Sequence, residues 1–144
     1  MPYRSELKKL EGVWNGTERI FDDAGEFEAT ARLVFQTVFD GRFLTCDYIQ
    51  TVPDRPQSVA HGVFRRDNRT EFLTVTWFRS PAPTATQQAD AVAEGDKPVF
   101  IETVDGRTTR TTYSVAMDKL AIRTDLLIEG GEWKPILEGT YRRR

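Results

Sequence analysis

Residues 27–52 read FEATARLVFQTVFDGRFLTCDYIQTV, and this stretch decides the fold class. Over residues 27–36, apolar side chains alternate with polar ones, with Val34 as the exception, and a period of two is that of a half-buried β-strand. Asp40 and Gly41 interrupt the pattern, and a second run with strand composition covers residues 42–52. Aspartate and glycine tolerate the positive φ angles that a tight hairpin turn needs. The stretch therefore predicts two neighbouring antiparallel strands joined by a short turn.

The same turn chemistry recurs twice further along the chain, at Asp105-Gly106 and at Gly130-Gly131. Short turns join neighbouring antiparallel strands, whereas parallel strands need long crossovers. The strands expected from composition and alternation cover residues 13–21, 27–36, 42–52, 58–66, 71–79, 87–93, 99–104, 108–117, 120–128 and 133–141. About ten strands at this spacing predict an all-β protein, either a barrel or a two-sheet sandwich. Because the short turns follow one another without long crossovers, we expect an up-and-down antiparallel β-barrel with room inside for one small ligand.

One short helix is expected ahead of the first strand, over residues 5–10. Ser5 is a suitable N-cap, Leu7 and Leu10 fall on one face, and Gly12 follows as a stop signal. A helix of about two turns is marginal alone in water, so it has to dock on another element. We expect it to cover one open end of the barrel.

The composition limits the classes of function. With 144 residues, 39% of them hydrophobic, the chain suits one globular domain over residues 1–144. Its 20 basic and 22 acidic residues are scattered, so neither nucleic acid nor an anionic membrane is a favoured partner. No segment has the length of an apolar membrane span, and no apolar signal core opens the chain. We therefore expect a cytoplasmic protein, either a monomer or a homodimer.

Metal and cofactor chemistry has little support in the sequence. Cys46 is the single cysteine, which excludes an internal disulfide and a cysteine-based zinc site. His61 is the single histidine, so a site with two or three histidine ligands is impossible. The chain carries neither a glycine-rich phosphate loop nor a nucleophile elbow. We expect no metal and no cofactor, and we assign no catalytic residue.

Several motifs occur in an order that resembles one bacterial family. They are Gly12-Val13-Trp14 after the short helix, residues 40–44, 61–64 and 76–78, and the ending from Trp133 to Arg142. Together they resemble DUF1579, an uncharacterised family of calycin-like barrels similar in fold to lipocalins and fatty-acid-binding proteins. The resemblance covers nearly the whole chain and implies the barrel fold, but it implies no activity, because the family's function is not established. The chain departs from the family pattern at Arg79, since an acidic residue usually follows the Trp-Phe pair.

The resemblance also implies how the floor of the barrel is built. In calycin barrels a tryptophan of the first strand fills the closed end, and a basic residue of the last strand lies over its ring. Trp14 matches that tryptophan. Arg142 is the best match for the basic residue, with the neighbouring Arg143 or Arg144 as alternatives.

Strand alternation indicates which side chains face the interior. The leading hypothesis is a non-enzymatic protein that binds a small, mostly apolar molecule in its cavity. Three aromatic side chains are expected to line this cavity, and three polar ones to orient the ligand. The aromatic residues are Trp77, Tyr48 and Tyr113, and the polar residues are Glu18, His61 and Arg123.

Two other classes of function stay open. A small barrel enzyme of the isomerase or cyclase type would use an inward acid–base pair, and two inward ionisable side chains within bonding distance would favour it. An interaction module with a filled barrel would have no cavity and would expose an apolar patch.

Overall fold

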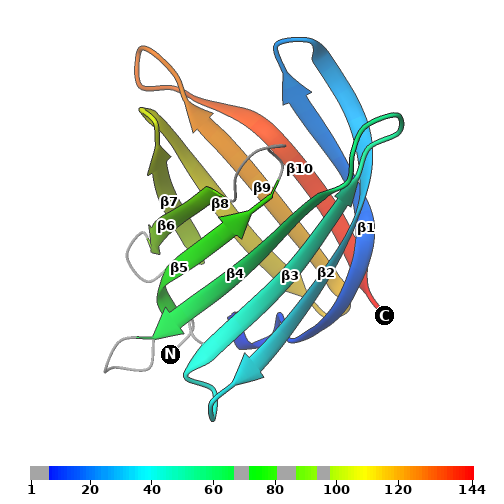
Figure 1. Cartoon of the computed structure of the whole chain (residues 1–144), viewed down its shortest axis with the longest axis vertical. Helices are drawn as coiled ribbons and strands as arrows, with labels where there is room; N and C mark the ends of the chain where they lie inside the picture. The colour runs from blue at the N-terminus through cyan, green and yellow to red at the C-terminus, as the bar shows by residue number, and fades with distance from the viewer. Residues whose placement is uncertain (1–6, 67–71, 81–86, 94–97) are drawn as a thin grey trace.

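The computed structural model describes residues 7–66, 72–80, 87–93 and 98–144, which form a closed antiparallel β-barrel (Figure 1). Each strand pairs with its neighbours in sequence, and β1 pairs with β10 to close the barrel. The strands are β1 (Gly12–Asp22), β2 (Gly25–Val38), β3 (Phe43–Thr51), β4 (Ser58–Arg66), β5 (Phe72–Arg79), β6 (Gln87–Ala93), β7 (Val99–Val104), β8 (Arg107–Ala116), β9 (Lys119–Leu127) and β10 (Trp133–Arg143). The predicted up-and-down barrel is confirmed, and so is the position of each expected strand.

The hairpin turn between β7 and β8 has the backbone conformation that its residues favour. Asp105 and Gly106, between β7 and β8, have φ angles of 51° and 79°. Both lie in the left-handed region, which glycine and aspartate enter more readily than bulky residues do. At the turn between β2 and β3, Phe39 also has a positive φ angle, ahead of Asp40 and Gly41. The alternating pattern therefore ends at this turn, as its sequence predicts.

The expected helix over residues 5–10 is not seen, and this expectation is corrected. From Leu7, where the description begins, the chain makes a single turn, with hydrogen bonds from the Leu10 amide to the Leu7 carbonyl (3.1 Å) and from the Glu11 amide to the Lys8 carbonyl (3.3 Å). The proposed N-cap, Ser5, lies outside the described residues. Strand β1 begins at Gly12, so the turn does not continue beyond Glu11. Leu7 and Leu10 are nevertheless fully buried and close one end of the barrel, which we call the floor.

The floor half of the interior is filled by aromatic rings. The ring of Phe64 is fully buried, and its centroid lies 5.4–6.4 Å from those of Phe35, Trp77, Phe100 and Tyr113. Most of these contacts are edge-to-face, the arrangement that the ring quadrupoles favour. A cavity lies toward the opposite end of the barrel, which we call the mouth.

Trp14 is held in the floor by two neighbours, Leu10 and Arg143. Its indole is fully buried, and Nε1 donates a 2.7 Å hydrogen bond to the carbonyl of Leu10. The guanidinium of Arg143 lies 4.3 Å from the ring centroid and donates hydrogen bonds to the carbonyls of Lys9 (2.8 Å) and Glu11. The N-terminal turn is thereby tied to both end strands of the barrel.

The residue over this ring is therefore Arg143, and the preference for Arg142 was wrong. In the pairing of β1 with β10, Trp14 lies opposite Arg143, while Arg142 lies opposite Asn15. Because side chains alternate between the two faces of a strand, Arg142 is directed outward and is exposed. The alternative at the next position supplies the contact.

Candidate binding cavity

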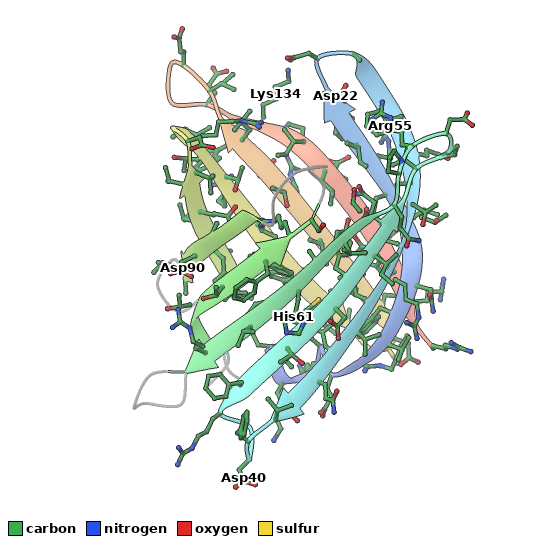
Figure 2. All side chains as sticks on the ribbon, viewed as in Figure 1. Asp22, Asp40, Arg55, His61, Asp90 and Lys134 are labelled. Atoms are coloured by element: carbon green, nitrogen blue, oxygen red, sulfur yellow. The ribbon has the colours of Figure 1, made fainter. Side chains whose placement is uncertain are left out.

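The mouth half of the barrel encloses a cavity of about 290 Å³. Figure 2 shows Asp22 and Lys134 at the mouth end and Asp40 at the floor end. Most lining residues are apolar or aromatic, and they come from strands all around the barrel. The cavity is lined by Glu18, Leu33, Phe35, Tyr48, Gln50, Ser58, Val59, Ala60, Trp77, Arg79, Thr111, Tyr113, Ile122, Thr124, Leu137 and Tyr141.

A buried carboxylate forms the polar centre of the cavity wall. Glu18, in the middle of β1, is only 2% exposed. Its Oε1 and Oε2 atoms accept hydrogen bonds from the Tyr48 hydroxyl at 2.7 and 2.9 Å. Gln50 Nε2 donates to Oε1 at 2.8 Å, and the Tyr141 hydroxyl donates to Oε2 at 2.5 Å. We call these four residues the Glu18 cluster; three strands, β1, β3 and β10, contribute to it.

The two phenol hydroxyls of the cluster stay protonated and act as hydrogen-bond donors. Burial raises the pKa of Tyr48 far above its ordinary value, and the neighbouring negative charge of Glu18 adds to the shift. The same two causes, in the same order, raise the pKa of Tyr141. Both hydroxyls therefore keep their protons throughout the physiological pH range and donate hydrogen bonds to the carboxylate. Such donors let a charged carboxylate stay inside the barrel.

A glycine opposite Glu18 makes room for the Tyr141 hydroxyl. Gly139 pairs with Glu18 across the seam between β1 and β10. A Cβ atom at Gly139 would overlap the Tyr141 hydroxyl oxygen and would come within 2.5 Å of Cζ of the same ring. The missing side chain is thus what allows Tyr141 to lie back along β10 and reach the carboxylate.

Replacing Gly139 with alanine is expected to lower the free energy of unfolding by about 2 kcal/mol, because it forces the Tyr141 hydroxyl away from a buried acceptor. Urea unfolding followed by far-ultraviolet circular dichroism measures the change. Thr140→Ala, at the exposed neighbouring position, serves as the control. A Gly139→Ala protein as stable as the wild type would show that the cluster does not depend on this space.

An ion pair lies at the mouth side of the cavity. Arg79 donates to both carboxylate oxygens of Glu102, at 3.0 and 3.1 Å, and Glu102 is only 12% exposed. The guanidinium also lies 5.5 Å from the centroid of Trp77. The pair reaches across β6, which carries the small residues Ala89 and Ala91 opposite Trp77 and Glu102. The positive charge of Arg79 is therefore neutralised by Glu102 within the protein.

Four of the six expected site residues line the cavity: Glu18, Tyr48, Trp77 and Tyr113. The inward direction expected for the other two was wrong. His61 lies on the outer face of β4, with its Nδ1 2.7 Å from Asp47 Oδ1 and with 46% of its side chain exposed (Figure 2). Arg123 is 53% exposed, and its Nε donates to Asp125 Oδ1 at 2.9 Å. In both strands the inward positions are the adjacent ones, so neither side chain contributes to the cavity.

Several polar groups around the cavity were not predicted from the sequence, among them Gln50, Tyr141 and the pair of Arg79 with Glu102. Gln50 is two residues from Tyr48 on β3, so the period of two was a usable signal. Tyr141 could have been found only from the pairing of β10 with β1. The pairing of Arg79 with Glu102 joins two strands that are not adjacent in the sheet, and no local pattern indicates it.

The structure also places Cys46. Cys46 is fully buried in the core, and burial raises the pKa of its thiol, so it stays a packed, protonated side chain.

Among the described residues, no three His, Cys, Asp or Glu side chains gather as metal ligands would. The described part of the chain also contains no helix long and apolar enough to cross a membrane.

Comparison with known proteins identifies the family and supports the fold. A family model described as "Protein of unknown function (DUF1579)" matches residues 2–143. Rv2717c from M. tuberculosis superimposes with a TM-score of 0.65 at 16% identity, covering 100% of this chain and 98% of that chain. The S-type phycobiliprotein lyase CPES from Guillardia theta does so with a TM-score of 0.57 at 12% identity, covering 99% and 94%. No curated protein matches the sequence. At these identities the two structures are similar in fold alone.

Proposed function

The chain belongs to the DUF1579 family of proteins of unknown function, and from its cavity we propose that it binds a small, mostly apolar molecule inside the barrel. The observation that carries the proposal is a cavity of about 290 Å³ with largely apolar walls and a few converging polar groups. Such a composition is typical of small-molecule sites. The volume is at the lower end of the usual range, so a compact ligand fits better than a long acyl chain.

The polar groups of the cavity are positioned before any ligand arrives. The Glu18 cluster is held by hydrogen bonds between strands, and the pair of Arg79 and Glu102 is bidentate. A site that needs no rearrangement avoids the entropic cost of ordering its side chains on binding. The filled-barrel interaction module is less favoured, because it requires an interior without a cavity.

Mass spectrometry of the purified protein, under native and then denaturing conditions, is the direct test. We expect a stoichiometric small molecule in the native spectrum that is released on denaturation. Binding is then measured by calorimetric titration of the stripped protein, from which any co-purified molecule has been removed. The probes are 3-phenylpropanol and indole, which are both compact and neutral. A bare chain in the native spectrum, combined with no heat from either probe, would contradict the binding function.

A variant can show that binding takes place inside the barrel. Ala60 lines the cavity, so Ala60→Phe fills part of its volume and is expected to weaken 3-phenylpropanol binding at least about tenfold, which corresponds to about 1.4 kcal/mol. Ala121→Phe is the matched control, because Ala121 is exposed on β9 and lines a separate hollow on the outer wall. Unchanged affinity in Ala60→Phe, or equal losses in both variants, would exclude the interior as the binding site.

A small barrel enzyme is the second candidate function. Glu18 lies within hydrogen-bonding distance of the phenols of Tyr48 and Tyr141, and inward ionisable groups in contact are what an acid–base mechanism needs. The raised pKa values of both phenols argue against rapid proton transfer near neutral pH. Incubation of any co-purified molecule with the protein, followed by NMR of the small molecule, distinguishes an enzyme from a binding protein. A time-dependent chemical change would favour the enzyme, whereas an unchanged spectrum would favour the binding protein.

A further inference from the structure

The cavity wall contains a negative charge that its own contacts do not neutralise. Among the described residues, the donors to Glu18 are Tyr48, Gln50 and Tyr141, which are all uncharged. Of the described residues that line the cavity, only Arg79 is a cation, and both of its terminal nitrogens bond to Glu102. The interior of the site thus carries the field of one unpaired carboxylate. In a partly buried setting this field acts more strongly than it would in water.

The carboxylate also keeps capacity for one more donor. An ionised carboxylate has roughly four lone-pair sites. The Tyr48 hydroxyl has a single hydrogen, which it shares between Oε1 and Oε2, and Gln50 and Tyr141 each contribute one more. Three hydrogens from the described residues therefore occupy a group that can accept about four. A ligand N–H has an acceptor available without displacing the protein's own donors.

The walls next to the carboxylate are aromatic. Tyr48 and Tyr141 belong to the cluster itself, and Phe35, Trp77 and Tyr113 line the same cavity. The faces of such rings attract cations, and an ammonium group in an aromatic enclosure gains from several faces at once. An aromatic enclosure with one carboxylate combines the two features that recognise an organic ammonium ion.

We propose that the natural ligand of this cavity is a compact organic amine, bound as its ammonium ion with the charged nitrogen at Glu18 and the apolar body against the aromatic walls. This inference rests on the proposed binding function and names the chemical class of its ligand. A carboxylic acid ligand is disfavoured by the same geometry. Its charge would face Glu18, and Arg79, the one cation among the described lining residues, is held by Glu102 in a bidentate pair.

A set of three probes with one skeleton tests the charge preference. 3-Phenylpropylamine is protonated at pH 7, 3-phenylpropanol is neutral and 3-phenylpropanoate is anionic, so the three differ mainly in their terminal group. Calorimetric titration of the stripped wild-type protein is expected to give at least tenfold tighter binding of the amine than of the alcohol. The propanoate is expected to bind more weakly than the alcohol. Equal affinities for the amine and the alcohol, or tightest binding of the propanoate, would overturn the inference.

Glu18→Gln removes the charge and keeps the size of the side chain. The preference for the amine over the alcohol is expected to disappear in this variant, while the alcohol still binds. Glu28→Gln makes the same change of charge at an exposed position of β2 and is expected to keep the wild-type preference. A preference that survives in Glu18→Gln would overturn the assignment of the carboxylate.

The possible failures can be told apart. Binding of the alcohol without preference for the amine would contradict only the ligand class. Absence of heat from all three probes, together with a bare native mass, would contradict the binding function itself. If Glu18→Gln does not fold, the ratio of amine to alcohol affinity in the wild type still decides the inference.

Discussion

Replacing Trp14 with alanine is expected to lower the free energy of unfolding by about 3–5 kcal/mol, the range seen when a fully buried large aromatic side chain is truncated. The indole has no exposed surface, so its loss leaves a cavity in the floor of the barrel. The Leu10 carbonyl would also lose the hydrogen bond from Nε1, and Arg143 would lose the ring beneath it. Urea unfolding followed by far-ultraviolet circular dichroism measures this loss without relying on tryptophan fluorescence.

Two arginine variants test whether Arg143 stabilises the floor of the barrel. Arg143→Ala removes the cation over Trp14 and the hydrogen bonds to the carbonyls of Lys9 and Glu11, whereas Arg142→Ala removes an exposed side chain. We expect a loss of about 1–2 kcal/mol for Arg143→Ala and almost none for Arg142→Ala. Equal losses, or a Trp14→Ala protein that keeps wild-type stability, would contradict this account of the floor.

Replacing Gly16 with alanine is expected to lower the free energy of unfolding by about 3 kcal/mol, because the new methyl group meets backbone atoms that cannot rotate away. A Cβ at this position would overlap the Thr140 carbonyl oxygen and lie 2.7 Å from the Cα atom of Tyr141. Gly16 pairs with Tyr141 in the seam that closes the barrel, so the strain would separate β1 from β10.

Hydrogen exchange locates this effect, since amides along β1 and β10 should exchange faster in Gly16→Ala than in the wild type, while those of β3 and β4 change less. Asn15→Ala, at the exposed neighbouring position, is the control and should leave the seam intact. A stable Gly16→Ala protein with unchanged exchange would show that the seam tolerates a wider spacing.

The success of the fold prediction and the partial success of the site prediction have different physical origins. Residues 58–66 were expected to form a strand, and β4 spans Ser58–Arg66. Alternation within a strand and the φ preferences of turn residues are properties of short segments, so they are visible in the sequence. His61 and Arg123 were assigned to the interior, and a shift by one residue exchanges the two faces of a strand. Which face of a strand points into the barrel depends on the register of that strand with its neighbours.

The sequence by itself therefore determined an all-β, up-and-down barrel with ten strands, because turn chemistry and the period of two act over a few residues. Only the tertiary structure decided which side chains meet in the interior and which partners they have there. Glu18 and Tyr141 are 123 residues apart in the chain, and they meet because β10 closes the barrel against β1. The place of Arg143 over Trp14 arises from the same closure. Arg79 and Glu102 meet because the wall of the barrel curves across β6. A barrel brings distant positions together through strand register and curvature, and neither quantity is encoded in any single segment.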